Sequence, residues 1–418
     1  SQNIIFDSEF VSANPTGPLH LGHGRGAIIG DVLGNIIKFI GNDYTKEFYI
    51  NDAGNQIQKL GHSFKIRCQQ ELGETIDIPE DGYHGLYLVE LAKKVINEFG
   101  KDVLNKQDSW FSEYAKQYML ANIKGTLEDY GVFFDVWFSE KTLHDSGAIK
   151  KALEKLEANG HLYEAEGALW FRSTTFGDDK DRVLKKNTGE YTYAAADVAY
   201  TENKFARGFN KLVIILVQDH HSYLQRLKGI TQALGHNPDN YDVILYQLVT
   251  LKESGALLKM SKRAGRGITL QDVIDEVGKD VARFFYLNRK ADAHLEFDID
   301  LALKHTDENP VYYIQYAYVR TKSILEKAAD IKEFNNINEQ DIEFIGTESS
   351  ILINYQTHLL TYYCLDLAQS FHAYYSANRV IDENNIQASR SRLLIIKIVN
   401  ENLKRCFKLL GIEAPEKM

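Results

Sequence analysis

A glycine-rich stretch near the N-terminus constrains the fold more than any other feature. Residues 14–26 read Asn-Pro-Thr-Gly-Pro-Leu-His-Leu-Gly-His-Gly-Arg-Gly. A strand-like run, Glu9 to Ser12, precedes them, and apolar residues at helical spacing follow from Ala27 to Ile37. The order predicts a strand, a tight turn and a helix start. Because the first turn of a helix carries unpaired N–H groups and partial positive charge, a phosphate is the favoured ligand here.

Three interpretations of this stretch are open. The first is a plain turn with two incidental histidines. The second is a dinucleotide-binding turn, because residues 22–27 fit G-x-G-x-x-A and Asp43 lies where a ribose-binding acid is expected. The third is a nucleotide-binding signature in which Gly22 lets a ligand approach while His20 and His23 face it together. A metal pair is disfavoured, because no cysteine and no third histidine lies nearby, and we expect no metal site.

A second motif lies in the other half of the chain. Residues 259–263 read Lys-Met-Ser-Lys-Arg and are followed by Ala264 and Gly265. Two lysines three residues apart in such a loop suit the clamping of a polyphosphate, although an isolated pair is more often a solvated basic turn. A dehydrogenase has no use for this loop. Together and in this order, the two motifs closely resemble the signatures of class I aminoacyl-tRNA synthetases.

Composition sets wider limits. The chain has 418 residues, enough for two or three domains, and its 44% hydrophobic content allows a sizeable core. The net charge of −10 argues against a generally basic coat for nucleic acid but allows local basic patches. Cys68, Cys364 and Cys406 have no metal-binding spacing, which favours a reducing cytoplasm. No apolar run is long enough for a membrane span, so we expect no membrane contact.

Strand patterns recur along the first three hundred residues and predict an α/β fold with a parallel sheet. Strands are expected at residues 44–50, 133–138, 212–217 and 243–249, and a strand of a small antiparallel element at 167–172. A polar helical region at about 61–125 interrupts the sheet as an insertion. Residues 177–182 read as a solvated charged turn, residues 253–255 as a hairpin turn and residues 269–272 as a helix cap.

After about residue 300 helical patterns dominate, at residues 311–328, 350–377 and 388–410, and predict a separate helix bundle. Four tyrosines cluster at the start of this part: Tyr312, Tyr313, Tyr316 and Tyr318. For most of them core packing is the preferred interpretation. The alternative is a platform on which unstacked RNA bases lie.

From residue 9 to the last residue, the chain resembles the bacterial arginyl-tRNA synthetases. Besides the two signatures, residues 49–56, 193–197, 219–221, 309–317 and 409–418 carry this resemblance. It implies a Rossmann-like catalytic domain with helical insertions over residues 1–300 and an all-α, helix-bundle anticodon-binding domain over residues 301–418. Family members usually begin with an additional N-terminal domain, which this chain is expected to lack.

The resemblance implies ATP-dependent activation of L-arginine to arginyl-adenylate and its transfer to the 3′ end of tRNA(Arg). Mg²⁺ would accompany ATP, and a cytoplasmic monomer is expected. Two alternatives stay open. Another nucleotidyl-transferring enzyme of the superfamily should lack the C-terminal helices, and a non-catalytic tRNA-binding relative should have lost a signature histidine or lysine.

The resemblance also assigns residues to roles. It makes catalytic the signature side chains His20, His23, Lys259 and Lys262. ATP binding involves both histidines and Lys262, together with Gly22, Asp219, Met260 and Ser261. The residues implied around arginine are Glu9, Asn14, Glu140, Tyr193, Asp197 and His220.

The chemistry of a guanidinium agrees with the arginine set. The group offers five fixed N–H donors and no acceptor, so its pocket needs carboxylates and neutral acceptors. Three converging carboxylates without a cation would repel one another, which raises their pKa values. A bound guanidinium removes that penalty, so Glu9, Glu140 and Asp197 are expected to converge. Tyr193 and Asp197 lie four residues apart and share a face if their segment is helical.

Overall fold

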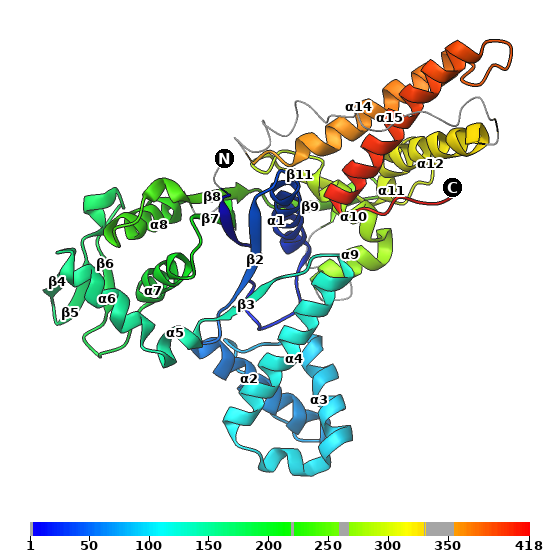
Figure 1. Ribbon diagram of the computed structural model, residues 1–418. Coiled ribbons are helices and arrows are strands. Elements are labelled where there is room, and N and C mark those ends of the chain that lie inside the picture. Colours follow the sequence, from blue (N-terminus) through cyan, green and yellow to red (C-terminus); the bar gives the residue numbers. More distant parts are fainter. Residues whose placement is uncertain (1–2, 219–220, 259–266, 330, 332–354) are drawn as a thin grey trace. The chain divides into compact units, whose positions relative to one another are not determined.

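The computed structural model describes residues 3–218, 221–258, 267–329, 331 and 355–418 (Figure 1). Contacts divide the chain into two compact units that alternate along the sequence. The first unit comprises residues 1–30, 41–246 and 260–272, and the second comprises residues 31–40, 247–259 and 273–418. The predicted loop at Lys259, Met260, Ser261 and Lys262 lies outside the described residues, as do Asp219 and His220. The boundary expected at residue 300 stays a prediction.

A five-stranded parallel sheet organises the first unit, and its strand order is β3-β2-β1-β7-β8 (Figure 1). The strands are β1 (Ile5–Glu9), β2 (Asp43–Ile50), β3 (Val136–Ser139), β7 (Lys211–Val217) and β8 (Tyr241–Tyr246). The predicted parallel sheet is therefore confirmed. From β1 the chain adds strands first on one side and later on the other, so the carboxyl ends of β1 and β7 flank a topological switch point. Ligands of open parallel sheets bind at such a point.

The helix expected after the glycine-rich turn is confirmed as α1 (Leu21–Phe39). It packs closely on the sheet, because a Cβ added to Gly30 would lie 2.5 Å from the Phe10 ring. The strand expected at residues 9–12 is wrong in its bounds, since β1 ends at Glu9. Val11 and Ser12 have φ values of 66° and 39°, so the chain makes a left-handed turn there. Such a turn leaves no mark on the apolar pattern of the sequence.

Helices fill the predicted insertion: α2 (Asn55–Glu71), α3 (Leu86–Phe99), η1 (Gly100–Asn105) and α4 (Asp108–Asp129). They enclose a core of their own around Leu60, Phe64, Leu91 and Phe111. The strand expected to begin at Phe133 starts only at Val136, because Phe133 is 61% exposed and adds nothing to the sheet. The Phe134 ring instead packs 4.5 Å from Phe10, centroid to centroid.

The small antiparallel element is confirmed as β4 (Leu162–Ala165), β5 (Ala168–Phe171) and β6 (Arg182–Lys185). Next to it lie α5 (Lys141–Asp145), α6 (Ala148–Ala158), η2 (Ser173–Phe176), α7 (Tyr193–Ala206), α8 (His221–Ala233) and η4 (Pro238–Asn240). The turn at 177–182 is not simply solvated. Asp178 is buried and accepts two hydrogen bonds from Arg182, at 2.8 and 2.7 Å. Burial opposes ionisation of Asp178, but these bonds prevail and lower its pKa to about 2.

The second unit holds a three-stranded sheet of β9 (Val249–Glu253), β10 (Ala256–Leu258) and β11 (Leu295–Asp298). The predicted hairpin turn is confirmed between β9 and β10, where Ser254 and Gly255 have φ values of 51° and 75°. The strand expected at residues 243–249 proves to be two, since β8 ends at Tyr246 and β9 begins at Val249. The Gln247 N–H bonds the Ala291 carbonyl at 2.9 Å, which turns the chain out of the large sheet.

The remaining helices of this unit are α9 (Leu270–Val277), α10 (Lys279–Leu287), α11 (Ile299–Ala302), α12 (Pro310–Ala329), α14 (His358–Ala377) and α15 (Ile386–Leu410). Helices α12, α14 and α15 pack on one another, so the predicted bundle is confirmed. Tyr318 is buried against Phe407, as preferred for these tyrosines, whereas Tyr316 is 37% exposed. Among the described residues, no helix combines the length and apolar character that crossing a membrane requires.

Candidate active site

The signature turn is joined to the chain that follows the predicted lysine loop. The Leu270 N–H donates to the Leu19 carbonyl at 2.8 Å, and the Leu21 N–H donates to Ile268 at 3.3 Å. Between them His20 and Thr269 form an antiparallel bridge. Thr269 also caps α9, because its hydroxyl accepts from the Asp272 N–H and its own N–H donates to the Asp272 carboxylate, so the predicted cap is confirmed. The segment at the end of the lysine loop is thus fixed to the turn.

His20 and His23 stack at the start of α1, with ring centroids 3.7 Å apart. Nδ1 of His20 accepts from the Gly22 N–H at 3.1 Å, and Nδ1 of His23 accepts from the His20 N–H at 3.2 Å. In a neutral imidazole whose Nδ1 accepts, the proton lies on Nε2. Both rings therefore present an Nε2–H donor. The rings also require Gly22, since a Cβ there would lie 2.9 Å from Cε1 of His20.

Partial burial of the two rings favours the neutral form of both histidines. It lowers the pKa of His20, and it lowers the pKa of His23 to about 3 with help from the charge of His20. His20 is exposed and His23 half-buried, so a ligand can reach them. Two neutral N–H donors at a helix start suit phosphate oxygens whose negative charge grows during a reaction.

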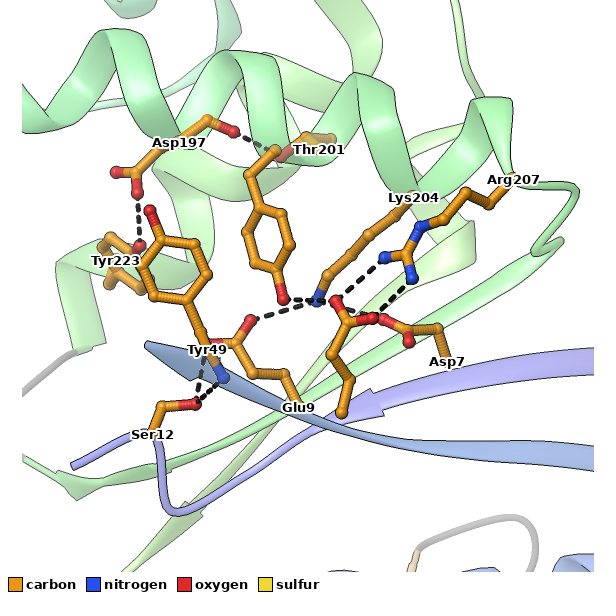
Figure 2. A network of polar contacts seen from close by, with 11 residues as sticks. Asp7, Glu9, Ser12, Tyr49, Asp197, Thr201, Lys204, Arg207 and Tyr223 are labelled. Atoms are coloured by element: carbon orange, nitrogen blue, oxygen red, sulfur yellow. Dashed lines mark hydrogen bonds and ion pairs between the residues drawn. The ribbon is translucent and has the colours of Figure 1, made fainter. Parts of the chain in front are cut away.

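Three of the predicted arginine-binding residues are carboxylates from different elements, and the structure brings them together. Glu9 ends β1, Glu140 follows β3 directly, and Asp197 lies on α7. Tyr49 donates a hydrogen bond to Glu140. The Tyr223 hydroxyl donates to Asp197 at 2.9 Å (Figure 2). The carboxylates influence one another: burial above all raises the pKa of Asp197 to about 7, and the charges of Glu9 and Glu140 add to that rise. Burial likewise raises the pKa of Glu140.

The left-handed turn after β1 fixes one oxygen of Glu9. The Ser12 hydroxyl donates to Oε1 of Glu9 at 3.2 Å and accepts from the Tyr49 N–H at 3.1 Å (Figure 2). A positive φ at a β-branched residue such as Val11 is costly and marks a position worth attention. Here the turn brings Ser12 back over the end of the strand that precedes it.

The other residues of the predicted arginine set are exposed or lie outside the described residues. Tyr193 opens α7 and is 66% exposed, one helical turn before Asp197, and Asn14 is also exposed. Asp219 and His220 directly follow the last described residue after β7. Within the described residues, no group of three or more His, Cys, Asp or Glu side chains is arranged to hold a metal ion.

Sequence reasoning missed several residues of this site, above all Ser12, Tyr49, Lys204 and Tyr223. Tyr49 lies in the stretch 49–56 that carries the family resemblance, so the resemblance could have identified it. Lys204 lies seven residues after Asp197 and therefore on the same face of α7. A lysine on a helix is normally solvated, so spacing alone gave no reason to place it in the interior.

Comparisons with known proteins agree along the whole chain. Residues 1–294 match the family described as class I tRNA synthetases (R), catalytic domain, and residues 314–418 match the DALR anticodon binding domain. The arginine–tRNA ligase of Anoxybacillus flavithermus is 46% identical and that of Bacillus subtilis 44%; each alignment covers 98% of this chain and 77% of the relative.

Solved structures also identify arginyl-tRNA synthetases as similar to this chain. A Campylobacter jejuni protein described as an arginyl-tRNA synthetase superposes with a TM-score of 0.91 at 36% identity, covering 100% of this chain and 95% of that one. The Thermus thermophilus arginyl-tRNA synthetase superposes with a TM-score of 0.73 at 20% identity, covering 100% of this chain and 83% of that one, which shows a shared fold.

Proposed function

The chain belongs to the class I arginyl-tRNA synthetases and is an arginine–tRNA ligase, and on this premise we propose how its residues divide the work. The observation that carries the proposal is the convergence of Glu9, Glu140 and Asp197, whose negative charges act on one another. The guanidinium of arginine offers positive charge and a fork of donors that fits carboxylate oxygens. These three residues form the arginine pocket, with Tyr193 and Asn14 at its rim.

In the first step, a carboxylate oxygen of arginine attacks the α-phosphorus of ATP, which forms arginyl-adenylate and releases pyrophosphate. The protein contributes position and charge stabilisation rather than a covalent nucleophile. His20 and His23 donate their Nε2–H groups to phosphate oxygens. Gly22 leaves room for the His20 ring at the ATP site. Lys259 and Lys262 hold the terminal phosphates of ATP. Asp219, Met260 and Ser261 are further ATP contacts, and His220 lies beside arginine.

In the second step, the 2′-hydroxyl of the terminal adenosine of tRNA(Arg) attacks the adenylate.

On the bundle of α12, α14 and α15, the Arg320 guanidinium lies 4.9 Å from the Tyr316 ring centroid and 4.6 Å from that of Tyr375. An exposed aromatic side chain beside a guanidinium is suited to stack an unpaired base. We assign this group to tRNA contact.

Three further parts of the proposal follow the family. Mg²⁺ would accompany ATP, as the family resemblance implies. Mg²⁺ would neutralise charge on the phosphates. The protein works as a cytoplasmic monomer.

The test is ATP–pyrophosphate exchange and tRNA charging by the whole chain, each with arginine or with lysine. Exchange should require arginine, and lysine should not replace it, because a point charge cannot use a fork-shaped site. Running the exchange with and without tRNA(Arg) shows whether the first step needs tRNA. Glu140→Gln should raise the arginine KM and leave the ATP KM unchanged. An arginine KM unaffected by this change would remove Glu140 from the pocket.

A further inference from the structure

A layer of buried charges lies next to Glu9, between the strands and helix α7 (Figure 2). Asp7 and Glu9 are two residues apart on β1 and therefore point to the same face of the sheet. Glu47 of β2 is in register with Glu9 and joins them. The side chains of Asp7 and Glu47 are fully buried, and that of Glu9 is 9% exposed. Three acids side by side in the interior require compensating charge.

Helix α7 supplies that charge from above the sheet. Nζ of Lys204 lies 3.0 Å from Oδ2 of Asp7 and 3.0 Å from Oε2 of Glu9, and its side chain is 1% exposed. Arg207, just after α7, donates two hydrogen bonds to Glu47 at 2.5 and 2.8 Å, and the Tyr200 hydroxyl donates to the same carboxylate. The layer thus holds three acids and two cations, Lys204 and Arg207.

Lys204 and Ser12 hold the two oxygens of Glu9 from opposite sides. Oε2 faces the ammonium, and Oε1 accepts from the Ser12 hydroxyl at 3.2 Å. A carboxylate held at both oxygens cannot rotate, so it presents a fixed acceptor edge to a ligand. Lys204 also separates the negative charges of Glu9 and Asp7, which would otherwise compete for one proton. Asp7 depends on this lysine, because no hydrogen bond of good geometry reaches either of its oxygens within the described part of the chain.

We propose that Lys204 is a positioning residue for arginine: its buried ammonium, shared between Asp7 and Glu9, holds the Glu9 carboxylate in place for the substrate. This inference rests on the proposed contact between Glu9 and arginine. Lys204 itself touches no substrate, because Glu9 and Asp7 occupy its ammonium. Its effect therefore passes through Glu9 alone.

The remaining groups around Lys204 do not offer it another role. From α7 itself, the Tyr200 ring lies 4.3 Å from Nζ. Tyr241 of β8 and Glu47 of β2 act on the ammonium electrostatically, and Arg207 is paired with Glu47. Burial disfavours the ammonium, but Asp7 and Glu9 prevail and raise the pKa of Lys204 well above its usual value. The lysine thus stays charged at any pH at which the enzyme would be assayed.

The test is arginine-dependent ATP–pyrophosphate exchange by the Lys204→Met protein between pH 6.5 and 8.5. Without the ammonium, Glu9 loses its fixed orientation and shares a proton with Asp7. We expect the arginine KM to rise roughly tenfold or more and to become pH-dependent, while the ATP KM changes little. Lys204→Arg keeps the charge and should restore the arginine KM to within about threefold of the original. Thermal melting shows whether each variant is folded.

Two variants serve as matched controls. Lys155→Met removes a lysine that pairs at 2.7 Å with Glu202 of α7 but is 37% exposed, and it should leave the arginine KM unchanged. Glu9→Gln separates this inference from the proposed pocket. If Glu9→Gln raises the arginine KM and a folded Lys204→Met protein does not, only the role of Lys204 is wrong. If Glu9→Gln has no effect, the proposed contact between Glu9 and arginine is wrong.

Asp7→Asn is the substitute if Lys204→Met does not fold. It preserves shape and leaves the ammonium to Glu9 alone, which draws Glu9 away from the substrate. The arginine KM should then rise several-fold at a constant ATP KM. An unchanged or lower arginine KM in folded Lys204→Met, or in Asp7→Asn when the first variant is insoluble, overturns the inference. Equal losses in both KM values and kcat would also overturn it, since they indicate a structural role.

Discussion

The two signature histidines contribute as neutral donors, and this has a kinetic consequence. Removing one donor that stabilises developing charge costs about 2–4 kcal/mol in the transition state. We therefore expect His23→Ala to slow exchange by a factor of roughly 30 to 1,000 with little loss of stability. Because the pKa of His23 is lowered to about 3, its ring does not change its protonation state between pH 6.5 and 8.5. We therefore expect titration of His23 to cause no change in the exchange rate across that range.

ATP–pyrophosphate exchange rates of His23→Ala and His62→Ala would measure this effect. His62 is an exposed histidine on α2 and serves as the control. His62→Ala should behave as the unmodified enzyme. Unchanged adenylate formation in His23→Ala would show that its imidazole does not contact the phosphates.

Asp197 links arginine binding to pH. Burial and the charges of Glu9 and Glu140 raise its pKa to about 7, so it is largely protonated at pH 6 in the free protein. Arginine requires the ionised form, so the arginine Kd should increase as pH falls from 8 to 6. Asp197→Asn should weaken binding by about 2–5 kcal/mol and lose most of this pH dependence. Calorimetric titration at pH 6, 7 and 8 tests both statements. A variant whose Kd varies with pH as steeply as the original would assign the effect to another group.

At the residue scale, the sequence was informative where chemistry and family resemblance coincide. The convergence of Glu9, Glu140 and Asp197 could be predicted because a guanidinium needs carboxylates, and the structure brings the three together. Their contact with arginine stays a prediction. The buried position of Lys204 could not be predicted, because it depends on how α7 covers the sheet. Tertiary packing decides which lysine of a helix is enclosed, and no local pattern records that.

At the scale of elements, the helical insertion supports the signature turn. The Tyr87 hydroxyl, next to the start of α3, donates to the Thr16 carbonyl at 2.5 Å, and the ring packs on Gly17. Tyr87→Phe removes only the hydroxyl and leaves a half-buried carbonyl without this donor. We expect a stability loss of about 1 kcal/mol, the usual cost of one such bond, and a several-fold lower exchange rate at an unchanged arginine Kd. Chemical denaturation and exchange kinetics would measure the two effects, with Tyr83→Phe of the same insertion as the control.

If Tyr87→Phe alters stability alone, the insertion does not help to place the signature turn. If the arginine Kd rises as much as the exchange rate falls, the hydroxyl acts on the amino acid pocket instead.

Element types followed from the sequence, and element bounds did not. The helices and the apolar parallel strands have strong periodic or continuous patterns, and the structure contains them. The errors arose where the backbone leaves a regular path. Val11 and Ser12 end β1 by a left-handed turn, and the Gln247 bond to Ala291 separates β8 from β9. Such changes depend on contacts remote in sequence.

At the scale of the whole molecule, the class of fold was predictable and the charge layer was not. Continuous apolar strands alternating with helices indicate a doubly wound sheet. The strand order, by contrast, places Asp7 and Glu9 of β1 beside Glu47 of β2 and beneath α7. These acids are distant in sequence from the cations that compensate them. Only the assembled sheet and helix show that they form one layer.

The charge of the empty pocket should also limit the stability of the free protein. The pKa of Asp197 is raised in the folded state, so the folded protein binds its proton more tightly than the unfolded chain does. The stabilisation from protonated Asp197 is complete below pH 4 and is lost as pH rises through about 7. Asp197→Asn removes this titration and keeps an oxygen that accepts the Tyr223 hydrogen bond. Without arginine, the variant should match the original at pH 5 and melt a few degrees higher at pH 8.

Saturating arginine should reverse that order at pH 8. A ligand that binds only the folded state stabilises it by an amount that grows with the ratio of its concentration to Kd. The original protein binds arginine tightly and gains more than Asp197→Asn, whose Kd is larger. Thermal melting of both proteins at pH 5 and 8, with and without arginine, measures all four differences. A variant that melts lower than the original at pH 8 without arginine would mean that ionised Asp197 is compensated within the protein, so the empty pocket would carry no such penalty.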